Sequence, residues 1–331
     1  MQVWFRLLFS TMIILVLTSA SVSASAEKEQ TREEQLQERM DYYVKYASPT
    51  LPWYYLAAVD QFERNIQQVR MDIPEKEGPI AIHFTKEFWS GALNPYTEDH
   101  SLGSLAFFNG NGRDGNQDGR ANPDDPDDAL HTMAMYISSY GYSEKSFKRA
   151  LMDFYERKET VNQIMTIAKI YGHYKTLNLD ERVFPLPVQN NYSYRSTWGV
   201  SRGWGGRRIH EGTDLFASYG VPVRATTYGQ VEIMGWNDFG GWRVGIRDVH
   251  NTYHYYAHLS GFNKEIKEGD LVEPGTVVGY VGSSGYGKEG TSGRFAPHLH
   301  YGMYKYNGRT EWAFDPFPYL RLWERNDKYG K

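Results

Sequence analysis

The stretch Arg208-Ile-His-Glu-Gly-Thr-Asp214 decides the fold of the second half of the chain, and Pro297-His-Leu-His-Tyr301 supports the same interpretation. In the first stretch His210 and Asp214 are four residues apart, and in the second the two histidines are two apart. Residues at even spacing point to one face of an extended strand. A spacing of two shares a face only in a strand, so these stretches predict a sheet that carries histidines on one side.

The sequence around these stretches has the pattern of an all-β domain. Of the 32 glycines, 23 lie from Gly199 onward, and they separate short runs rich in β-branched and aromatic residues. Such runs between turn residues are typical of strands. The predicted strands cover residues 221–226, 230–234, 242–247, 252–259, 276–281 and 299–304.

The residues on the histidine-bearing face predict a metal site. His210, Asp214 and one histidine of the His-x-His pair offer nitrogen and oxygen ligands suited to a catalytic zinc that keeps one position for water. The chain has no cysteine, so thiolate ligands, cysteine nucleophiles and disulfides are excluded. His258 is then a free imidazole for proton transfer or oxyanion stabilisation. His254 is expected to pack or to support a ligand.

The first half of the chain has helical periodicity, so the chain as a whole is expected to be α+β and multidomain. The predicted helices cover residues 31–46, 53–69, 127–140 and 143–174. Pro185 and Pro187 mark a linker. The predicted organisation is a signal peptide over residues 1–26, a helical domain over 27–180, a linker over 181–189 and a β domain over 190–325.

Residues 1–26 have the pattern of a secretory signal: Arg6, an apolar run over residues 7–18, then Ala24-Ser25-Ala26. An uncleaved membrane anchor is the alternative. The protein is therefore expected to be secreted or in the cell wall, with no membrane span beyond this segment. Lys and Arg number 36 against 40 Asp and Glu, a net charge of −4 that argues against a nucleic-acid partner.

Longer motifs of the β half resemble those of the lysostaphin-type zinc metallopeptidases, which cut peptidoglycan peptides. The matching motifs are His210-Glu-Gly-Thr-Asp214-Leu, Tyr255-Tyr-Ala-His258-Leu and Pro297-His298-Leu-His300-Tyr. The resemblance covers about residues 184–320 and implies an open antiparallel sheet with a duplicated hybrid motif. It also implies zinc held by His210, Asp214 and His300, with His258 and His298 as the catalytic pair.

A further resemblance implies which peptide bond is cut. The run over residues 235–248 and the overall layout are similar to the sporulation-associated L-Ala-D-Glu endopeptidases of spore-forming bacilli. This implies peptidoglycan stem peptides as partner and a role in spore cortex or cell-wall maturation, with a spore-envelope location. Stem peptides carry carboxylates that arginine forks bind well, and Arg207, Arg208, Arg243 and Arg247 are the candidates. Solvated surface arginines are the alternative.

The helical half resembles, more weakly, a degenerate lysozyme-like lytic transglycosylase domain. The segment over residues 51–64 resembles the helix that carries the catalytic acid in that family, and Glu63 takes the acid's position. Arg64 departs from the family's usual serine, and the loop around Ser104 lacks its glutamine. These departures favour a packing helix, with or without weak glycan affinity, over glycan cleavage.

A second metal site is predicted in the loop over residues 114–125, which has the calcium-loop spacing Asp-x-Asn-x-Asp-Gly. An acidic surface turn is the alternative, because the twelfth position is Asp rather than the usual Glu. The oxygen ligands would come from Asp114, Asn116, Asp118, the backbone of Arg120, Asn122 and Asp125.

Three functions are thus open at the level of sequence. The first is a secreted zinc endopeptidase of peptidoglycan. The second is a non-catalytic peptidoglycan-binding or regulatory module, which the intact ligand positions disfavour. The third is a dual hydrolase that also cuts glycan strands through Glu63.

Overall fold

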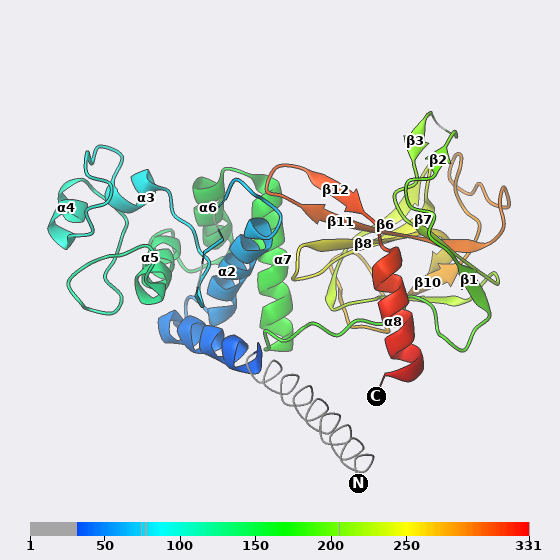
Figure 1. The fold of residues 1–331 in the computed structure, drawn as a ribbon, viewed down its shortest axis with the longest axis horizontal. Helices are drawn as coiled ribbons and strands as arrows, with labels where there is room; N and C mark the ends of the chain where they lie inside the picture. The colour runs from blue at the N-terminus through cyan, green and yellow to red at the C-terminus, as the bar shows by residue number, and fades with distance from the viewer. Residues whose placement is uncertain (1–31, 74, 77, 205, 331) are drawn as a thin grey trace, which may run out of the picture.

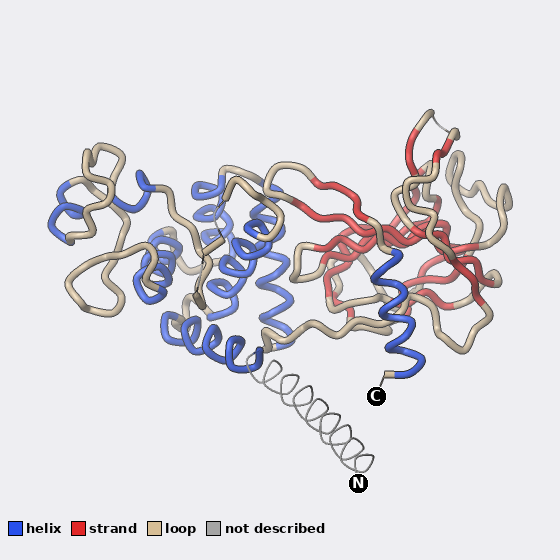
Figure 2. Tube along the Cα trace, viewed as in Figure 1, coloured by secondary structure: helices blue, strands red, loops and turns tan. Residues whose placement is uncertain are grey.

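The computed structural model describes residues 32–330, apart from residues 74, 77 and 205. Helices gather in one half of the molecule and strands in the other (Figure 1, Figure 2). The predicted signal segment, residues 1–26, lies outside the described residues. In the part of the chain that is described, no helix combines the length and the apolar character needed to cross a membrane.

The first half of the described chain is helical, as predicted. Residues 32–46 are helical, and the helices that follow are α2 (Trp53–Gln67), α3 (Lys86–Ser90), α4 (Leu102–Phe107), α5 (Pro126–Ser139), α6 (Glu144–Tyr155) and α7 (Lys158–Tyr174). The range 143–174, expected as one helix, is two helices. Glu156 ends α6 in a left-handed conformation with φ 56°, which breaks the helical path before α7 begins.

The second half is built on a ten-stranded antiparallel sheet, as expected. Its core order is β1-β4-β11-β8-β7-β6-β9, with β10 between β5 and β8, and β12 beside β11. All six predicted strands are present. The strands are β1 (Tyr192–Tyr194), β4 (Thr213–Ala217), β5 (Pro222–Arg224), β6 (Gly229–Asn237), β7 (Gly241–Arg247), β8 (Thr252–Phe262), β9 (Leu271–Val272), β10 (Val277–Val281), β11 (His298–Tyr306) and β12 (Glu311–Phe314). A separate two-stranded sheet pairs β2 (Ser201–Arg202) with β3 (Arg208–Ile209).

The expectation of a purely β second half misses one helix, α8 (Phe317–Tyr329). Its buried residues Leu320 and Trp323 join the core of the sheet. The Trp323 ring lies 6.2 Å from that of Tyr301 on β11, with the ring planes 80° apart. The helix therefore covers one face of the sheet (Figure 1). The other, open face carries half-buried side chains such as Tyr253, Tyr255 and Tyr304.

The segment expected to link the two halves is part of the sheet's core. Phe184 and Leu186 are fully buried among the core residues of the sheet. Arg224 on β5 donates its backbone N–H to the Pro185 carbonyl at 2.8 Å. The two prolines therefore lie in a segment without helix or strand that packs against the sheet.

The helical half packs directly against the sheet. Asn65 on α2 donates a buried hydrogen bond to the Val249 carbonyl at 2.9 Å, and Thr166 on α7 bonds Gln230 on β6 at 3.0 Å. Tyr306 at the end of β11 belongs to the helical half's hydrophobic core. Buried contacts of this kind hold the two halves in a defined relation.

The loop with calcium-like spacing is held by its own side chains. The Asp114 carboxylate accepts the backbone N–H groups of Gln117, Asp118 and Gly119. Asn116 donates to the carboxylates of Asp118 and Asp125. Asp125 caps α5 by accepting from the two following N–H groups past Pro126. The oxygens expected to bind calcium thus serve the loop's turns and the helix start.

Glu63 is enclosed in the helical core. It is 7% exposed, and its carboxylate accepts a hydrogen bond from the Tyr155 hydroxyl at 2.6 Å. Burial, reinforced by the Asp60 carboxylate and opposed by the Tyr155 hydrogen bond, raises the pKa of Glu63 to about 7. Burial disfavours the charged form of a carboxyl group, so folded Glu63 keeps its proton to a higher pH than the unfolded chain does.

We predict that Glu63→Gln stabilises the protein increasingly as the pH rises from about 4.5 to 7. In that window the unfolded chain loses the proton that folded Glu63 keeps, so the free energy of unfolding of the wild type falls. Glutamine is neutral throughout and still accepts from Tyr155. The gain above pH 7 should approach about 3 kcal/mol, measured by denaturant unfolding at several pH values. Parallel pH profiles for the two proteins would contradict the buried, protonated state.

Candidate active site

The pairing of β4 with β11 places the predicted metal ligands side by side. His300 on β11 lies opposite Asp214 on β4 in the antiparallel register. His210 precedes β4 and is separated from it by Gly212. A Cβ atom on Gly212 would lie 2.5 Å from Cε1 of His300, so only glycine lets that ring approach.

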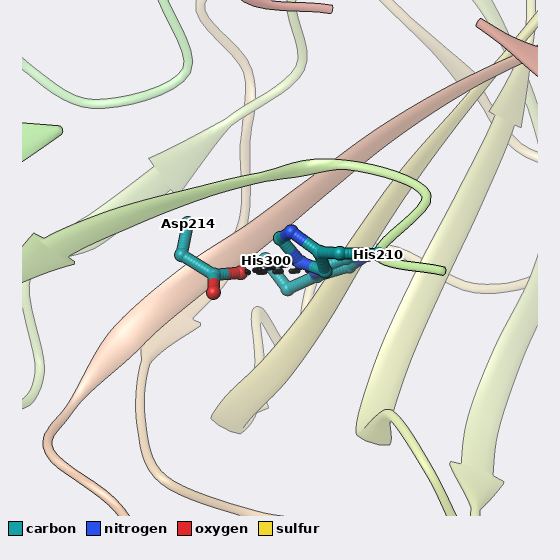
Figure 3. Close-up of side chains that lie close together, drawn as sticks. All are labelled: His210, Asp214 and His300. Carbon is teal, nitrogen blue, oxygen red and sulfur yellow. Dashed lines mark hydrogen bonds and ion pairs between the residues drawn. The ribbon is translucent and has the colours of Figure 1, made fainter. Parts of the chain in front are cut away.

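The three predicted ligands converge on one point (Figure 3). Asp214 Oδ1 lies 3.0 Å from His210 Nε2 and 3.0 Å from His300 Nδ1. The two histidine nitrogens are 2.9 Å apart. Among the described residues, these form the one group of three His, Asp or Glu side chains whose donor atoms all lie within 4.8 Å of each other.

The chemistry of this group fits zinc. The His210 Nδ1–H donates to the Thr197 carbonyl at 2.8 Å, which leaves the Nε2 lone pair directed at the cluster. Burial would raise the pKa of Asp214, but hydrogen bonds from His210 and His300 outweigh it and hold the carboxyl well below its usual range. Two imidazole nitrogens and one ionised carboxylate are a catalytic zinc's protein ligands.

Arg202 binds the outer oxygen of Asp214, a contact that sequence reasoning missed. Its Nη2 lies 2.6 Å from Asp214 Oδ2, which leaves Oδ1 for the cluster. Arg202 reaches this position because β2 pairs with β3, opposite Arg208. No spacing rule reveals a contact that depends on a pair of two-residue strands.

His258 and His298 lie beside the cluster with matching orientations. The Nδ1–H of His258 donates to the Ser284 carbonyl at 2.7 Å, and that of His298 donates to the Ala296 carbonyl at 2.8 Å. Their rings are 4.9 Å apart, and His298 Nε2 lies 3.7 Å from Asp214 Oδ1. Both rings therefore present Nε2 to the site.

Burial lowers the pKa values of these histidines. The pKa of His258 falls to about 3, through burial first and then through the neighbouring rings of His298 and His300. Burial also lowers the pKa values of His298 and His300. The two rings beside the cluster are therefore neutral near pH 7, with an unprotonated Nε2 facing the site.

His254 lies on the opposite side of the sheet. It is 1% exposed, and its ring nitrogens contact the Tyr301 hydroxyl at 2.6 Å and Asp248 at 3.4 Å. The strand alternation that would align it with His258 is broken at His258, whose φ is 63°. His254 is a packing residue of the core.

The cluster forms the base of a cavity of about 310 Å³. Aromatic residues that sequence reasoning did not select surround it. Phe216, Phe239, Tyr286 and Phe295 line it, and Trp204 stacks on Tyr286 with ring centroids 4.8 Å apart. They come from three separate loops and one strand, so only the fold brings them together.

The four candidate arginines have different surroundings. Arg208 lines the cavity, with its guanidinium carbon 5.0 Å from the ring centre of Phe239. Arg207 is exposed and lies outside the cavity lining. Arg243 lines a neighbouring cavity. Arg247 is buried, and its charge is balanced by ion pairs with Glu232 and Glu311.

Comparison with known proteins adds independent support. The model of "Peptidase family M23" matches residues 208–316. The L-Ala--D-Glu endopeptidase of Bacillus subtilis (strain 168) is 52% identical over 320 residues, which cover 96% of this chain and 98% of that protein. Lysostaphin of Staphylococcus staphylolyticus is 35% identical over 125 residues, or 37% of this chain and 23% of that protein.

Among solved structures, a putative glycyl-glycine endopeptidase lytM from Ruminococcus gnavus is 35% identical, covering 56% of this chain and 74% of that chain, with a TM-score of 0.41. The near full-length relative at 52% identity and the matched family model agree with the predicted family. The chain therefore belongs to peptidase family M23 and is, as predicted, a metallopeptidase.

Proposed function

We propose that the protein is a zinc endopeptidase that cleaves the L-Ala–D-Glu bond of peptidoglycan stem peptides. The observation that carries the proposal is the convergence of His210, Asp214 and His300 beside the paired imidazoles of His258 and His298. The full-length relative with 52% identity is an L-Ala--D-Glu endopeptidase, which supports the choice of bond.

In this proposal His210 Nε2, Asp214 Oδ1 and His300 Nδ1 hold the metal. Arg202 occupies the other carboxylate oxygen of Asp214, Oδ2, so Oδ1 would be the oxygen offered to the metal. Zinc, when bound, supplies Lewis-acid activation of a water molecule and of the scissile carbonyl. The remaining chemistry belongs to side chains of this chain.

His258 and His298 move the protons. The carbonyls of Ser284 and Ala296 hold each ring with Nδ1 protonated, so each Nε2 accepts a proton from the attacking water or donates one afterwards. The protonated ring also stabilises negative charge on the carbonyl oxygen. The two imidazoles come from different strands, β8 and β11, and their ring centres lie 4.9 Å apart beside the cluster.

Arg208 is the proposed carboxylate-binding residue. Its guanidinium faces the cavity, stacked on Phe239, and its buried Nε has no hydrogen-bond partner among the described residues. A stem peptide places the free carboxylate of D-Glu next to the scissile bond. An arginine fork held by an aromatic ring matches that group.

Export, a cell-wall location and a role in cortex maturation during sporulation complete the proposal. Export follows from the signal pattern of residues 1–26, and the location follows from the substrate. Sporulation rests on the resemblance of residues 235–248.

The two rival functions lack a supporting site. A purely binding module has no use for five convergent metal and proton-transfer groups. Glycan cleavage through Glu63 needs an acid that reaches a sugar, and Glu63 lies within the helical core, bonded to Tyr155. The endopeptidase is the function that the geometry favours.

We expect His300→Ala to lose both bound zinc and hydrolysis, whereas His258→Ala and His298→Ala keep zinc and lose activity by roughly 100- to 10,000-fold. Zinc content is measured by metal analysis, and activity on stem peptides by chromatography. His173→Ala, an exposed histidine of α7, is the matched control. Hydrolysis by a zinc-free His300→Ala enzyme would refute the ligand assignment.

We expect Arg208→Gln to raise KM by about tenfold or more for stem peptides with a free D-Glu carboxylate, because a hydrogen-bonded charge is lost. For peptides in which that carboxylate is amidated, the KM of Arg208→Gln should differ little from that of the wild type. The exposed neighbour Arg207→Gln is the control. An equal rise in KM on both substrates would contradict a role of Arg208 in carboxylate recognition.

Digestion of purified muropeptides tests the bond itself. We expect mass analysis to show release of peptides that begin with D-Glu and sugars that retain L-Ala. Products cut only at cross-bridges, or between D-Glu and diaminopimelate, would contradict the proposed bond and leave the peptidase family intact.

A further inference from the structure

The open face of the sheet carries three neighbouring cavities that extend away from the metal cluster and share lining residues. The active-site cavity shares Tyr255 and Tyr304 with a second cavity of about 500 Å³. That second cavity shares Glu232, Arg247 and Glu311 with a third of about 1020 Å³. The third lies between the sheet and helices α6 and α7, so the series ends at the helical half.

Strand β11 sets the length of this series. His298 and His300 are at the active site, Tyr304 lines the first two cavities, and Tyr306 lines the third. These residues share one face by strand alternation, whereas Leu299 and Tyr301 point into the core. Tyr306 lies six residue steps beyond His300, which is about 20 Å of strand.

Aromatic rings form the floor between the two ends. Ring centres are 6.0 Å apart for His300 and Tyr255, 6.3 Å for Tyr255 and Tyr304, and 6.1 Å for Tyr304 and Tyr253. A Cβ atom on Gly245 would lie 1.8 Å from the Tyr253 hydroxyl, so this glycine lets the tyrosine lie along the sheet. The floor is therefore a built surface of half-buried rings.

The third cavity is electrically neutral. Four carboxylates and four cations line it, and several are already paired: Lys148 with Glu144 at 2.7 Å, and Arg247 with Glu232 and Glu311. Such a balance offers no net attraction to an acidic peptide. It suits an uncharged ligand.

The uncharged residues that line the third cavity are suited to a ligand that carries hydroxyl and acetamido groups. Asn162, Gln163 and Thr310 carry side chains that both donate and accept hydrogen bonds. Tyr54 and Tyr55 add apolar ring surface with hydroxyl groups at the edge. Pockets that combine aromatic surface with a few polar groups are typical ligand sites.

We infer that this interdomain cavity and the tyrosine floor bind the glycan strand of peptidoglycan, with the helical half as one wall of the site. The inference rests on the proposed function, because the L-Ala of a stem peptide is joined to that strand. A glycan strand that passes the metal cluster would continue along β11 into the cavity. Its N-acetyl amino sugars are uncharged where the stem is attached, matching the neutral lining.

The β11–β12 turn and α7 both contribute residues to the lining of the cavity, and Figure 1 shows the ribbon of these two elements. Thr310 on the turn and Asn162 on α7 are both exposed side chains. Tryptophan at either position should fill the cavity from one side without entering a hydrophobic core. Asp153→Trp, on an exposed face of α6 outside the lining, is the matched control.

The test uses the zinc-loaded enzyme with peptide-free glycan strands and, separately, sugar-free stem peptides. We expect Asn162→Trp and Thr310→Trp to weaken the binding of peptide-free glycan strands by about tenfold or more. We expect the KM for intact peptidoglycan to rise by a similar factor. Hydrolysis of the sugar-free peptide should be unchanged, which also shows that the variants fold. Asp153→Trp should match the wild type in all three measurements.

Unchanged strand binding in both variants, or no strand binding by the wild type, would overturn the inference. Equal losses on intact peptidoglycan and on the sugar-free peptide would overturn it as well, because the effect would then act through the active site. If strand binding is lost in both variants while the wild type cuts another bond, the proposed bond fails and the glycan site is supported.

Discussion

The antiparallel register between β4 and β11 is the constraint on which the active site depends. It sets Asp214 opposite His300, and the absence of a side chain on Gly212 lets the His300 ring close onto the carboxylate. A shift of one residue would turn every side chain of β11 to the other face. The buried alternation of Leu299, Tyr301 and Met303 against the core prevents that shift. Packing on one face of the sheet thus maintains the chemistry on the other.

Loop carbonyls complete what the strands begin. Thr197, Ser284 and Ala296 each accept the Nδ1–H of one histidine, so His210, His258 and His298 all turn Nε2 toward the same space. Three lone pairs and an ionised carboxylate gathered in a buried site are costly to maintain without a cation or a proton. This arrangement favours metal binding, and it depends on the loops that supply the three carbonyls.

The two faces of the sheet have separate tasks. α8 covers one face with Leu320 and Trp323 and shields the core. The other face carries the metal cluster at one end and meets the helical half at the other, with tyrosines between them. Buried hydrogen bonds such as Asn65 to Val249 fix the helical half in place. The helical half therefore lies where it can contact a long substrate, although its Glu63 side chain is buried in the helical core.

The sequence by itself determined the helical and β halves and six strands of the sheet. It also singled out His210, Asp214, His258, His298 and His300 by their spacing, whereas their separate roles were implied by the family resemblance. It could do so because strand alternation and ligand spacing are local properties of the chain. Only the tertiary structure decided that Arg202 binds Asp214, that aromatic residues surround the cavity, and that Arg247 pairs with Glu232 and Glu311 within the sheet. It also decided that α8 covers the core and that residues 143–174 break at Glu156. These features depend on contacts between segments far apart in the chain, which no local pattern encodes.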